Sequence, residues 1–254
     1  MSSGFLDGEE NLGGRGLDRL DPRSRVLAAV AVVIAVLALR STAVLAATLP
    51  ALVVAALISG LSARDLARRM AHLEGFLIVL AILLPLTVAG PTVGRIGPFA
   101  VTETGLARAG VLLLRVNATA LVLVTLLGGL EPIRFGHALA RLGVPAKLVH
   151  LLLFTARWVD LVRGEARRLE ESMRIRAFRV HLGPHGLRTL GAFVGQLLVR
   201  AFERAERVEE AMRCRAFAGR FALLGEDRFS RSDLVFAAAV AAVVLLLPTL
   251  DRIA

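Results

Sequence analysis

The chain has 254 residues, of which 56% are hydrophobic and only 5% are aromatic. Soluble domains are usually about 45–50% apolar, so this composition excludes an ordinary water-soluble globule and a disordered chain. The formal net charge is +10, and every basic residue except Lys147 is an arginine. The single cysteine, Cys214, excludes an internal disulfide, and the sequence has no cluster of zinc ligands.

Five apolar stretches are candidate membrane-spanning helices, because crossing a bilayer takes about 20 mostly apolar residues. They comprise residues 26–39, 43–58, 73–89, 105–127 and 234–247. The first stretch is short and reaches this length only if Arg25 and Arg40 snorkel at its ends. The first 25 residues lack the apolar core of a cleavable signal, so we expect none. The sequence therefore predicts an all-α, polytopic membrane helical bundle with about five spans.

The distribution of arginines predicts the orientation of these spans. With a cytoplasmic N-terminus, five spans leave 26 basic residues inside and only Arg40, Arg95 and Arg252 outside. Arg108 and Arg115 then lie within the fourth span. This asymmetry follows the positive-inside rule, so we expect a multi-pass protein of the cell's inner (cytoplasmic) membrane.

This threading divides the chain into four parts. Residues 1–25 form a cytoplasmic N-terminal segment, and residues 26–128 form the first four transmembrane helices. Residues 129–232 form a large cytoplasmic region, and residues 233–254 hold the last transmembrane helix and the C-terminus. The outer loops are short, and the one at 90–104 is rich in Gly and Pro. We therefore expect function to lie in the cytoplasmic region.

Two long amphipathic helices are predicted in this cytoplasmic region, because apolar or small residues recur there at steps of three and four. The first stripe runs from Leu148 to Met173, and the second runs from Leu190 to Met212. Glycine and proline within residues 181–186 separate the two helices. We expect the two helices to pack against each other or to cross.

Both predicted helices end in nearly the same eight residues. Residues 171–178 and 210–217 match at six of eight positions and share the pattern Met-Arg-x-Arg-Ala-Phe. A guanidinium at a helix end can form a forked bond to a carboxylate of another protein, worth about 1.5–3 kcal/mol. The alanine permits close approach, and the phenylalanine offers an apolar anchor. We predict two equivalent docking points, formed by Arg176, Ala177 and Phe178 and by Arg215, Ala216 and Phe217. Arg174 and Arg213 are supporting residues, because they could equally pair with Glu170 and Glu209, four residues earlier in each helix.

With these signatures the chain resembles the transmembrane T component of energy-coupling factor (ECF) importers, most closely the cobalt/nickel-type, CbiQ-like branch. Further likeness lies in residues 20–27, 142–145, 154–158 and 204–208. In that family, Ala-Arg-Gly-type signatures end two long coupling helices, and each docks into a groove on one of two ATPase subunits. Here the corresponding residues are Ile175-Arg176-Ala177 and Cys214-Arg215-Ala216, with alanine in place of the glycine and isoleucine or cysteine in place of the first alanine.

The resemblance implies a non-catalytic transporter subunit that works with two ATPase subunits, a substrate-binding membrane (S) subunit and the lipid bilayer. It also implies cobalt or nickel as the cargo, recognised on the S subunit. This chain has no P-loop motif, and we expect it to hold no cofactor and no metal. The same scaffold serving a vitamin importer is an alternative.

Other classes of function are also open to test. A stand-alone membrane enzyme or channel could use Arg108, Arg115 and Asn117, because charge within a span is costly and often functional. The simpler interpretation is that Arg108 lies at the membrane interface and that Arg115 pairs within the bundle. The basic residues at 163–179 alternate with glutamates, and aromatics are sparse, so we expect no nucleic-acid partner.

Overall fold

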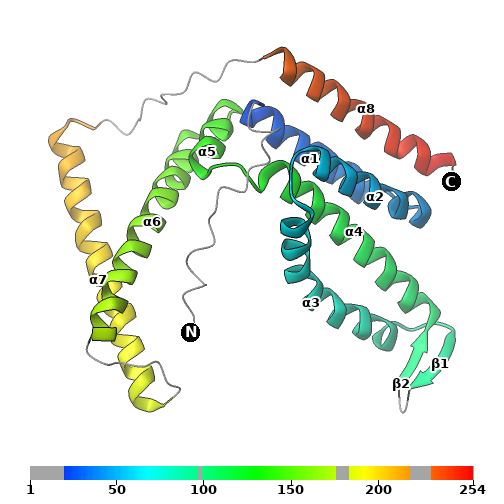
Figure 1. The fold of residues 1–254 in the computed structure, drawn as a ribbon, viewed down its shortest axis with the longest axis horizontal. Helices are drawn as coiled ribbons and strands as arrows, with labels where there is room; N and C mark the ends of the chain where they lie inside the picture. The colour runs from blue at the N-terminus through cyan, green and yellow to red at the C-terminus, as the bar shows by residue number, and fades with distance from the viewer. Residues whose placement is uncertain (1–19, 97–98, 176–182, 218–229, 254) are drawn as a thin grey trace. The chain divides into compact units, whose positions relative to one another are not determined.

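The computed structural model describes residues 20–96, 99–175, 183–217 and 230–253. Figure 1 shows the elements coloured along the chain. In order, they are α1 (Pro22–Ala38), α2 (Thr42–Ile58), α3 (Ala63–Thr87), β1 (Thr92–Ile96), β2 (Phe99–Thr102), α4 (Glu103–Leu127), α5 (Pro132–Arg141), α6 (Ala146–Ile175), α7 (Pro184–Cys214) and α8 (Arg231–Ile253).

The chain divides into two compact units. The first unit combines residues 1–138 with residues 226–254, and the second unit comprises residues 139–225. In the first unit, α4 packs against α1, α2 and α3, and α8 packs against α1. Each of the five predicted apolar stretches falls on one of these helices. The prediction of an all-α membrane protein is therefore confirmed.

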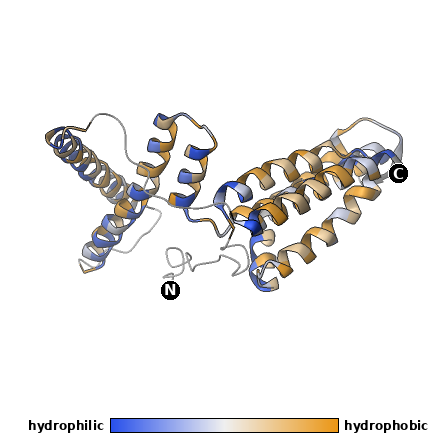
Figure 2. Cartoon of the chain, turned by 90° about the horizontal axis from the view of Figure 1, so that it is seen from above, coloured by the Kyte–Doolittle hydropathy of each residue, from blue (hydrophilic) through white to orange (hydrophobic). Residues whose placement is uncertain are grey.

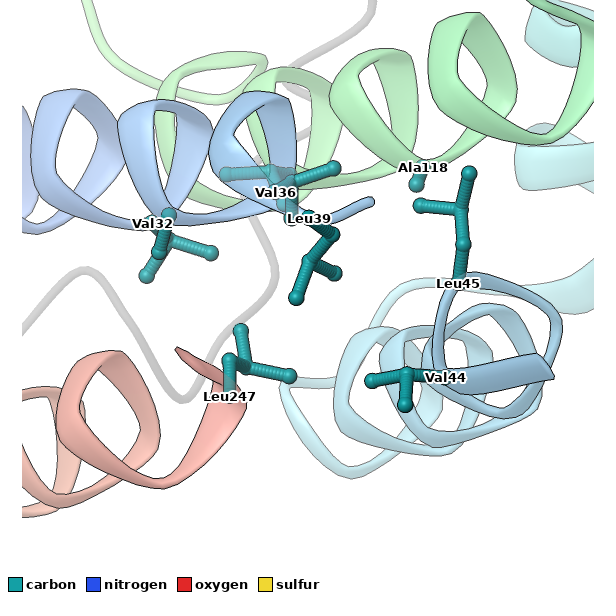
Figure 3. Packing of buried hydrophobic residues seen from close by; sticks show 9 residues of the cluster. Val32, Val36, Leu39, Val44, Leu45, Ala118 and Leu247 are labelled. Atoms are coloured by element: carbon teal, nitrogen blue, oxygen red, sulfur yellow. The ribbon is translucent and has the colours of Figure 1, made fainter. Parts of the chain in front are cut away.

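Four helices of the first unit share an apolar core, which Figure 3 shows from close by. Val36 of α1, Leu45 of α2, Ala118 of α4 and Leu247 of α8 meet there, and each is at most 8% exposed. Lipid tails are as apolar as these side chains, so close packing rather than exclusion of water holds such helices together. The small, fully buried Ala118 suits this packing because it lets α4 approach α2.

The helices α3 and α4 approach closely at Gly105, in the first turn of α4. A Cβ atom at this position would lie 2.6 Å from the Cα of Pro85 and 2.8 Å from the carbonyl oxygen of Leu84, both in α3. Contacts this short leave no room for a side chain, so the close approach requires glycine. Thr102, the N-cap of α4, adds a hydrogen bond from its hydroxyl to the Val88 carbonyl at 2.7 Å.

Among the described residues, the helices differ in their capacity to cross a membrane. By length and apolar composition, α4 and α8 can each cross a bilayer. Figure 2 shows that hydrophobic residues predominate in the group of helices on the side of the C-terminus. The helix α3 is a third candidate if its segments Ala63–Ala71 and Glu74–Thr87, which meet at 48°, form one span. The helices α1 and α2 have 17 residues each, so they are shorter than an average span.

Two details of the first unit differ from the prediction. The third apolar stretch, predicted from residue 73, belongs to a helix that already begins at Ala63. That helix starts early because the hydroxyl of Ser62 accepts a hydrogen bond from the Asp65 amide at 3.1 Å, which is an N-cap. The loop predicted at 90–104 contains an antiparallel hairpin, in which β1 pairs with β2.

The second unit is built on α6 and α7, which fall where the two amphipathic helices are predicted. Gly183 is the N-cap of α7, and Pro184 occupies the first turn, where a backbone N–H is not needed. Residues 184–186 are thus part of α7 rather than part of the predicted break. In these two helices the buried residues are Val149 and Gly186, so most of their apolar side chains stay accessible.

Candidate docking site

The helices α6 and α7 cross near their middles, as Figure 1 shows within the second unit. Trp158 and Val162 of α6 and Leu197 and Ala201 of α7 line a groove at this crossing. Val162, Leu197 and Ala201 belong to the predicted apolar stripes, and Trp158 precedes the stripe residue Val159 in the sequence. The predicted contact between the two helices is therefore present, and it takes the form of a crossing.

An ion-pair network connects the two helices at the crossing. Glu165 of α6 pairs with Arg200 of α7 and, at 3.0 Å, with Arg168 of its own helix. The pKa of the Glu165 carboxyl lies below its ordinary value, mainly because the Arg200 guanidinium donates a hydrogen bond to it. The pair is accessible to solvent, so its contribution to stability is small, but it defines which turns of the two helices meet.

The crossing sends the two predicted docking ends in different directions. Ile175 ends α6 about 15 Å beyond Glu165, and Cys214 ends α7 about 21 Å beyond Arg200, at 1.5 Å per residue. A parallel crossing would put the end of α6 about 39 Å from Pro184, at the start of α7. Eight residues lie between Ile175 and Pro184, and the nine steps along the chain span at most about 32 Å, so a parallel crossing is excluded and the two ends diverge.

The end of α7 is a Schellman motif. The Ala216 amide donates to the Arg213 carbonyl at 3.0 Å, and the Phe217 amide donates to the Met212 carbonyl at 3.1 Å. Ala216 has a φ of 54°, in the left-handed region that favours glycine. This is the position at which the resembling family has glycine. The chain keeps the glycine-type turn with an alanine, at a conformational cost of roughly 1 kcal/mol.

The two arginines at this end differ in their partners. Arg213 pairs with Glu209, one turn earlier in α7, at 2.5 Å. The side chain of Arg215 is exposed and forms no hydrogen bond or ion pair within the part of the chain that the structure describes. The neighbouring Cys214 is a free, exposed thiol. The guanidinium of Arg215 is thus available to a carboxylate of another protein, whereas that of Arg213 is held by its own helix.

The first signature repeats the second as far as the structure describes it. Arg174 pairs with Glu170 at 2.7 Å, in the same i,i+4 arrangement as at the end of α7. Ile175, the last residue of α6, is 87% exposed. Outside the described residues lie Arg176, Ala177 and Phe178. The docking role of both signatures stays a prediction.

Polar side chains of α4 bind backbone carbonyls inside the first unit. Arg115 donates from Nη2 to the Leu39 carbonyl, at the end of α1, at 2.8 Å. Asn117 donates from Nδ2 to the Leu113 carbonyl of its own helix at 3.1 Å. A cation beside the end of α1 is favourable because the last helical carbonyls lack partners. The interpretation that Arg115 pairs within the bundle is confirmed, and Arg108 is exposed.

The first unit contains a buried polar cluster that was not predicted from the sequence. Asp233, which is 1% exposed, accepts hydrogen bonds from the amide of Asp21 at 2.7 Å and the amide of Ser230 at 2.9 Å. The pattern Ser230-x-x-Asp233 before an apolar run is the signature of a capping box, so the second contact was readable. The first contact joins residues 212 positions apart, and no local pattern predicts it. Among the described residues, no group of three or more His, Cys, Asp or Glu is placed to hold a metal ion.

Comparison with known proteins identifies the family of the chain. The family model CbiQ, described as a cobalt transport protein, matches residues 13–223. The energy-coupling factor transporter transmembrane protein EcfT of Thermosediminibacter oceani is 24% identical over 234 residues, which cover 87% of this chain and 86% of the relative. The family match takes in α1 to α7 and both signatures. The chain therefore belongs to the CbiQ family of cobalt transport proteins and is the transmembrane T component of an ECF transporter.

Proposed function

We propose that this chain couples ATP hydrolysis by two partner ATPase subunits to the movement of a substrate-binding membrane (S) subunit. The chain itself is non-catalytic, and it is a multi-pass protein of the inner (cytoplasmic) membrane. The observation that carries the proposal is Arg215, at the capped end of α7, whose exposed side chain has no partner among the residues that the structure describes. Its signature is repeated in the sequence at the end of α6.

The contacts between helix ends support a five-span topology. At one end of the first unit, the start of α1 contacts the start of α8 through Asp21 and Asp233 and the end of α4 through Arg25 and Leu126. At the other end, Asp251 of α8 contacts the turn between α1 and α2. The helices α1 and α8 therefore run in the same direction and α4 runs in the opposite one, as five alternating spans require. With the N-terminus in the cytoplasm, 26 of the 31 basic residues lie on the cytoplasmic side, as the positive-inside rule requires.

Docking of the two helix ends follows from their chemistry and separation. Each signature offers an arginine fork, a small residue and an aromatic anchor, and each lies on a different arm of the crossed pair. A charge-assisted bond from Arg215 to a carboxylate contributes about 1.5–3 kcal/mol, or roughly one to two orders of magnitude in affinity. Two such ends on diverging arms suit two separate ATPase subunits.

Movement of the docked ends passes along α6 and α7. When ATP closes the ATPase dimer, the two ends move with different subunits, and the arms pivot about the Glu165–Arg200 crossing. Apolar side chains along both arms are open to a partner, and Leu151 and Phe202 are 63% and 68% exposed. These surfaces suit a very hydrophobic membrane subunit, which then moves with the arms.

Cobalt or nickel is the proposed cargo of the assembled importer. The support for a metal is the description of the matching family as cobalt transport proteins. Transport by the purified complex in liposomes tests this assignment. The ATPase subunits face the lumen, ATP is enclosed in the lumen, and Co²⁺ or Ni²⁺ is added outside. ATP-dependent uptake of either ion supports it. If the complex takes up a vitamin and neither metal ion, the assigned cargo is wrong and the proposed coupling role still holds.

The coupling role is tested first by purifying the tagged chain from its native membrane in a mild detergent. We expect ATPase subunits and a small, very hydrophobic membrane protein to co-purify, because the docking ends and apolar arms both need partners. Identification of every recovered protein is the measurement. A folded chain that is recovered alone contradicts the proposal.

Arginine substitutions sharpen this test. Arg215→Gln should lower the recovery of ATPase subunits about tenfold, because it removes one charge-assisted bond. Arg213→Gln is the matched control, since it is the same substitution two residues away at an arginine already paired with Glu209. The double variant Arg176→Glu/Arg215→Glu should abolish both docking and transport. Unchanged complex yield and transport in that double variant overturns the proposal.

A further inference from the structure

The cytoplasmic region leaves the first unit at two places, and both contact the start of α1. One is the end of α4 and the residues after it, 126–131, and the other is the start of α8, residues 230–233. We call these two segments the roots of the cytoplasmic region. They are about 100 residues apart in sequence, yet each is hydrogen-bonded to residues 21–25.

The tie to the first root is made by Arg25. This arginine is 2% exposed and donates from Nε to the Leu126 carbonyl at 2.9 Å. Leu126 lies in the last turn of α4, where carbonyls have no partner within the helix. A cation at that end is also favoured by the helix dipole. Arg25 is thus a C-terminal cap of α4 that is supplied by α1.

The tie to the second root is made by Asp233, whose two oxygens serve different helices. Oδ2 accepts the Ser230 amide at 2.9 Å and closes the capping box of α8. Oδ1 accepts the Asp21 amide at 2.7 Å and lies 3.2 Å from the hydroxyl of Ser24, which also lies 2.7 Å from the Asp21 carbonyl and shares its proton between the two oxygens. Asp21 is itself the N-cap of α1, so this one carboxylate joins the starts of the first and last helices.

These ties are rigid because their members are buried and polar. Ser24 is 7% exposed, Asp21 is 5% exposed, and Arg25 and Asp233 are less exposed still. A buried polar group that loses its partner cannot turn to water, so such networks hold one arrangement. We propose that Arg25 and Asp233 are positioning residues that hold the two roots at a fixed separation on the start of α1. The consequence for transport rests on the proposed function. Because the distance between the roots is fixed, movement of α6 and α7 moves the first unit and does not merely separate the two roots.

The opposite end of the same unit provides matched ties that touch neither root. Arg115 donates to the Leu39 carbonyl at the end of α1, at 2.8 Å, as Arg25 does at the end of α4. Asp251 accepts the amides of Arg40 and Ser41, at 3.0 Å and 2.7 Å, much as Asp233 accepts amides at the root. These residues make the same chemical bonds between helices, so they are internal controls.

The separation of the roots can be measured directly by electron paramagnetic resonance. Nitroxides on Glu131→Cys and Arg231→Cys report it, because both positions are exposed and each lies within one root, with Cys214→Ser removing the native thiol. The full chain is measured in lipid nanodiscs. We expect Arg25→Gln and Asp233→Asn to broaden the distance distribution about twofold, since they release one root each. The control variants Arg115→Gln and Asp251→Asn should leave it unchanged.

The four variants together separate positioning from general stability. A merely structural role would lower stability in all four without a selective change at the roots, so equal distributions in Arg25→Gln, Asp233→Asn and the controls overturn the inference. Ser24→Ala removes the 3.2 Å contact with Asp233 and the 2.7 Å hydrogen bond to the Asp21 carbonyl, and it keeps a small buried residue. It should broaden the distribution slightly, and it keeps the test decisive if Asp233→Asn does not fold.

The consequence for transport is measured on the complete complex in liposomes, as Co²⁺ taken up per ATP hydrolysed. Arg25→Gln and Asp233→Asn should keep complex yield and ATP hydrolysis while this ratio falls about tenfold, within the usual range of coupling between sites. A ratio equal to that of the control variants contradicts the consequence. A wild-type complex that does not transport Co²⁺ counts against the proposed function alone, because the root separation is measured without cargo or partners.

Discussion

In the first unit, apolar side chains of α1, α2, α4 and α8 meet and are buried. The helices α6 and α7 of the second unit meet at one crossing, and among their apolar side chains only that of Val149 is buried. Exposed apolar residues in the first unit, such as Ile82, lie on helices suited to face lipid. Those of α6 and α7 alternate with charges, which lipid does not accommodate on all sides. The first unit therefore holds itself together, and the second unit offers surfaces for partners.

The largest expected effect comes from truncating the same residue type in each unit. Leu45→Ala removes a side chain that is 1% exposed and leaves a cavity against Ala118, so it should destabilise the chain by about 2–4 kcal/mol. Leu198→Ala, at a position 53% exposed on α7, should change stability by less than about 0.5 kcal/mol. Unfolding of the purified chain in mixed detergent micelles measures both. Equal losses would contradict the division of roles between the units.

A smaller effect is expected at the capped end of α7. Ala216→Gly should stabilise this end by roughly 0.5–1 kcal/mol, because glycine adopts the φ of 54° without steric cost. Ala211→Gly, the same substitution in the body of α7, should instead destabilise the helix by about 1 kcal/mol. Hydrogen exchange of the Phe217 amide, which donates to the Met212 carbonyl, reports both changes. Slower exchange in Ala211→Gly or faster exchange in Ala216→Gly would overturn the assignment of the motif.

The smallest effect is a weak dependence of the crossing on pH. Because the folded pKa of Glu165 is lowered, its ion pair stabilises the crossing above the ordinary glutamate pKa and is lost as the pH falls through the lowered value. Trp158, the only tryptophan in the chain, lines the crossing, so its fluorescence should change in that acidic range.

Two substitutions give this titration its controls. Glu165→Gln should remove the acidic change in Trp158 fluorescence, because it removes the titrating carboxyl. Glu170→Gln should keep it, since Glu170 pairs with Arg174 within α6 and not across the crossing. An acidic transition that survives in Glu165→Gln would show that another group controls the crossing.

The sequence by itself determined the features that depend on local pattern. Runs of apolar residues identified α1, α2, α3, α4 and α8, steps of three and four identified α6 and α7, and the repeated octapeptide identified the candidate docking ends. These signals are readable because helix period, apolar length and capping are set by residues within a few positions of one another. The early start of α3 at Ser62-x-x-Asp65 belongs to the same class and was readable too.

Only the tertiary structure decided which distant residues meet. Neither the bond of Asp233 to Asp21 nor that of Arg25 to the Leu126 carbonyl has a local signature, because each depends on how whole helices pack. The exposure of the Arg215 side chain was likewise seen only in the structure, whereas the i,i+4 pair of Glu209 with Arg213 is a local pattern that the sequence already showed. The left-handed turn at Ala216 was also beyond the sequence, since alanine gives no sign of it. Hydrogen bonds between residues brought together by folding, rather than residue type, assign these side chains their roles.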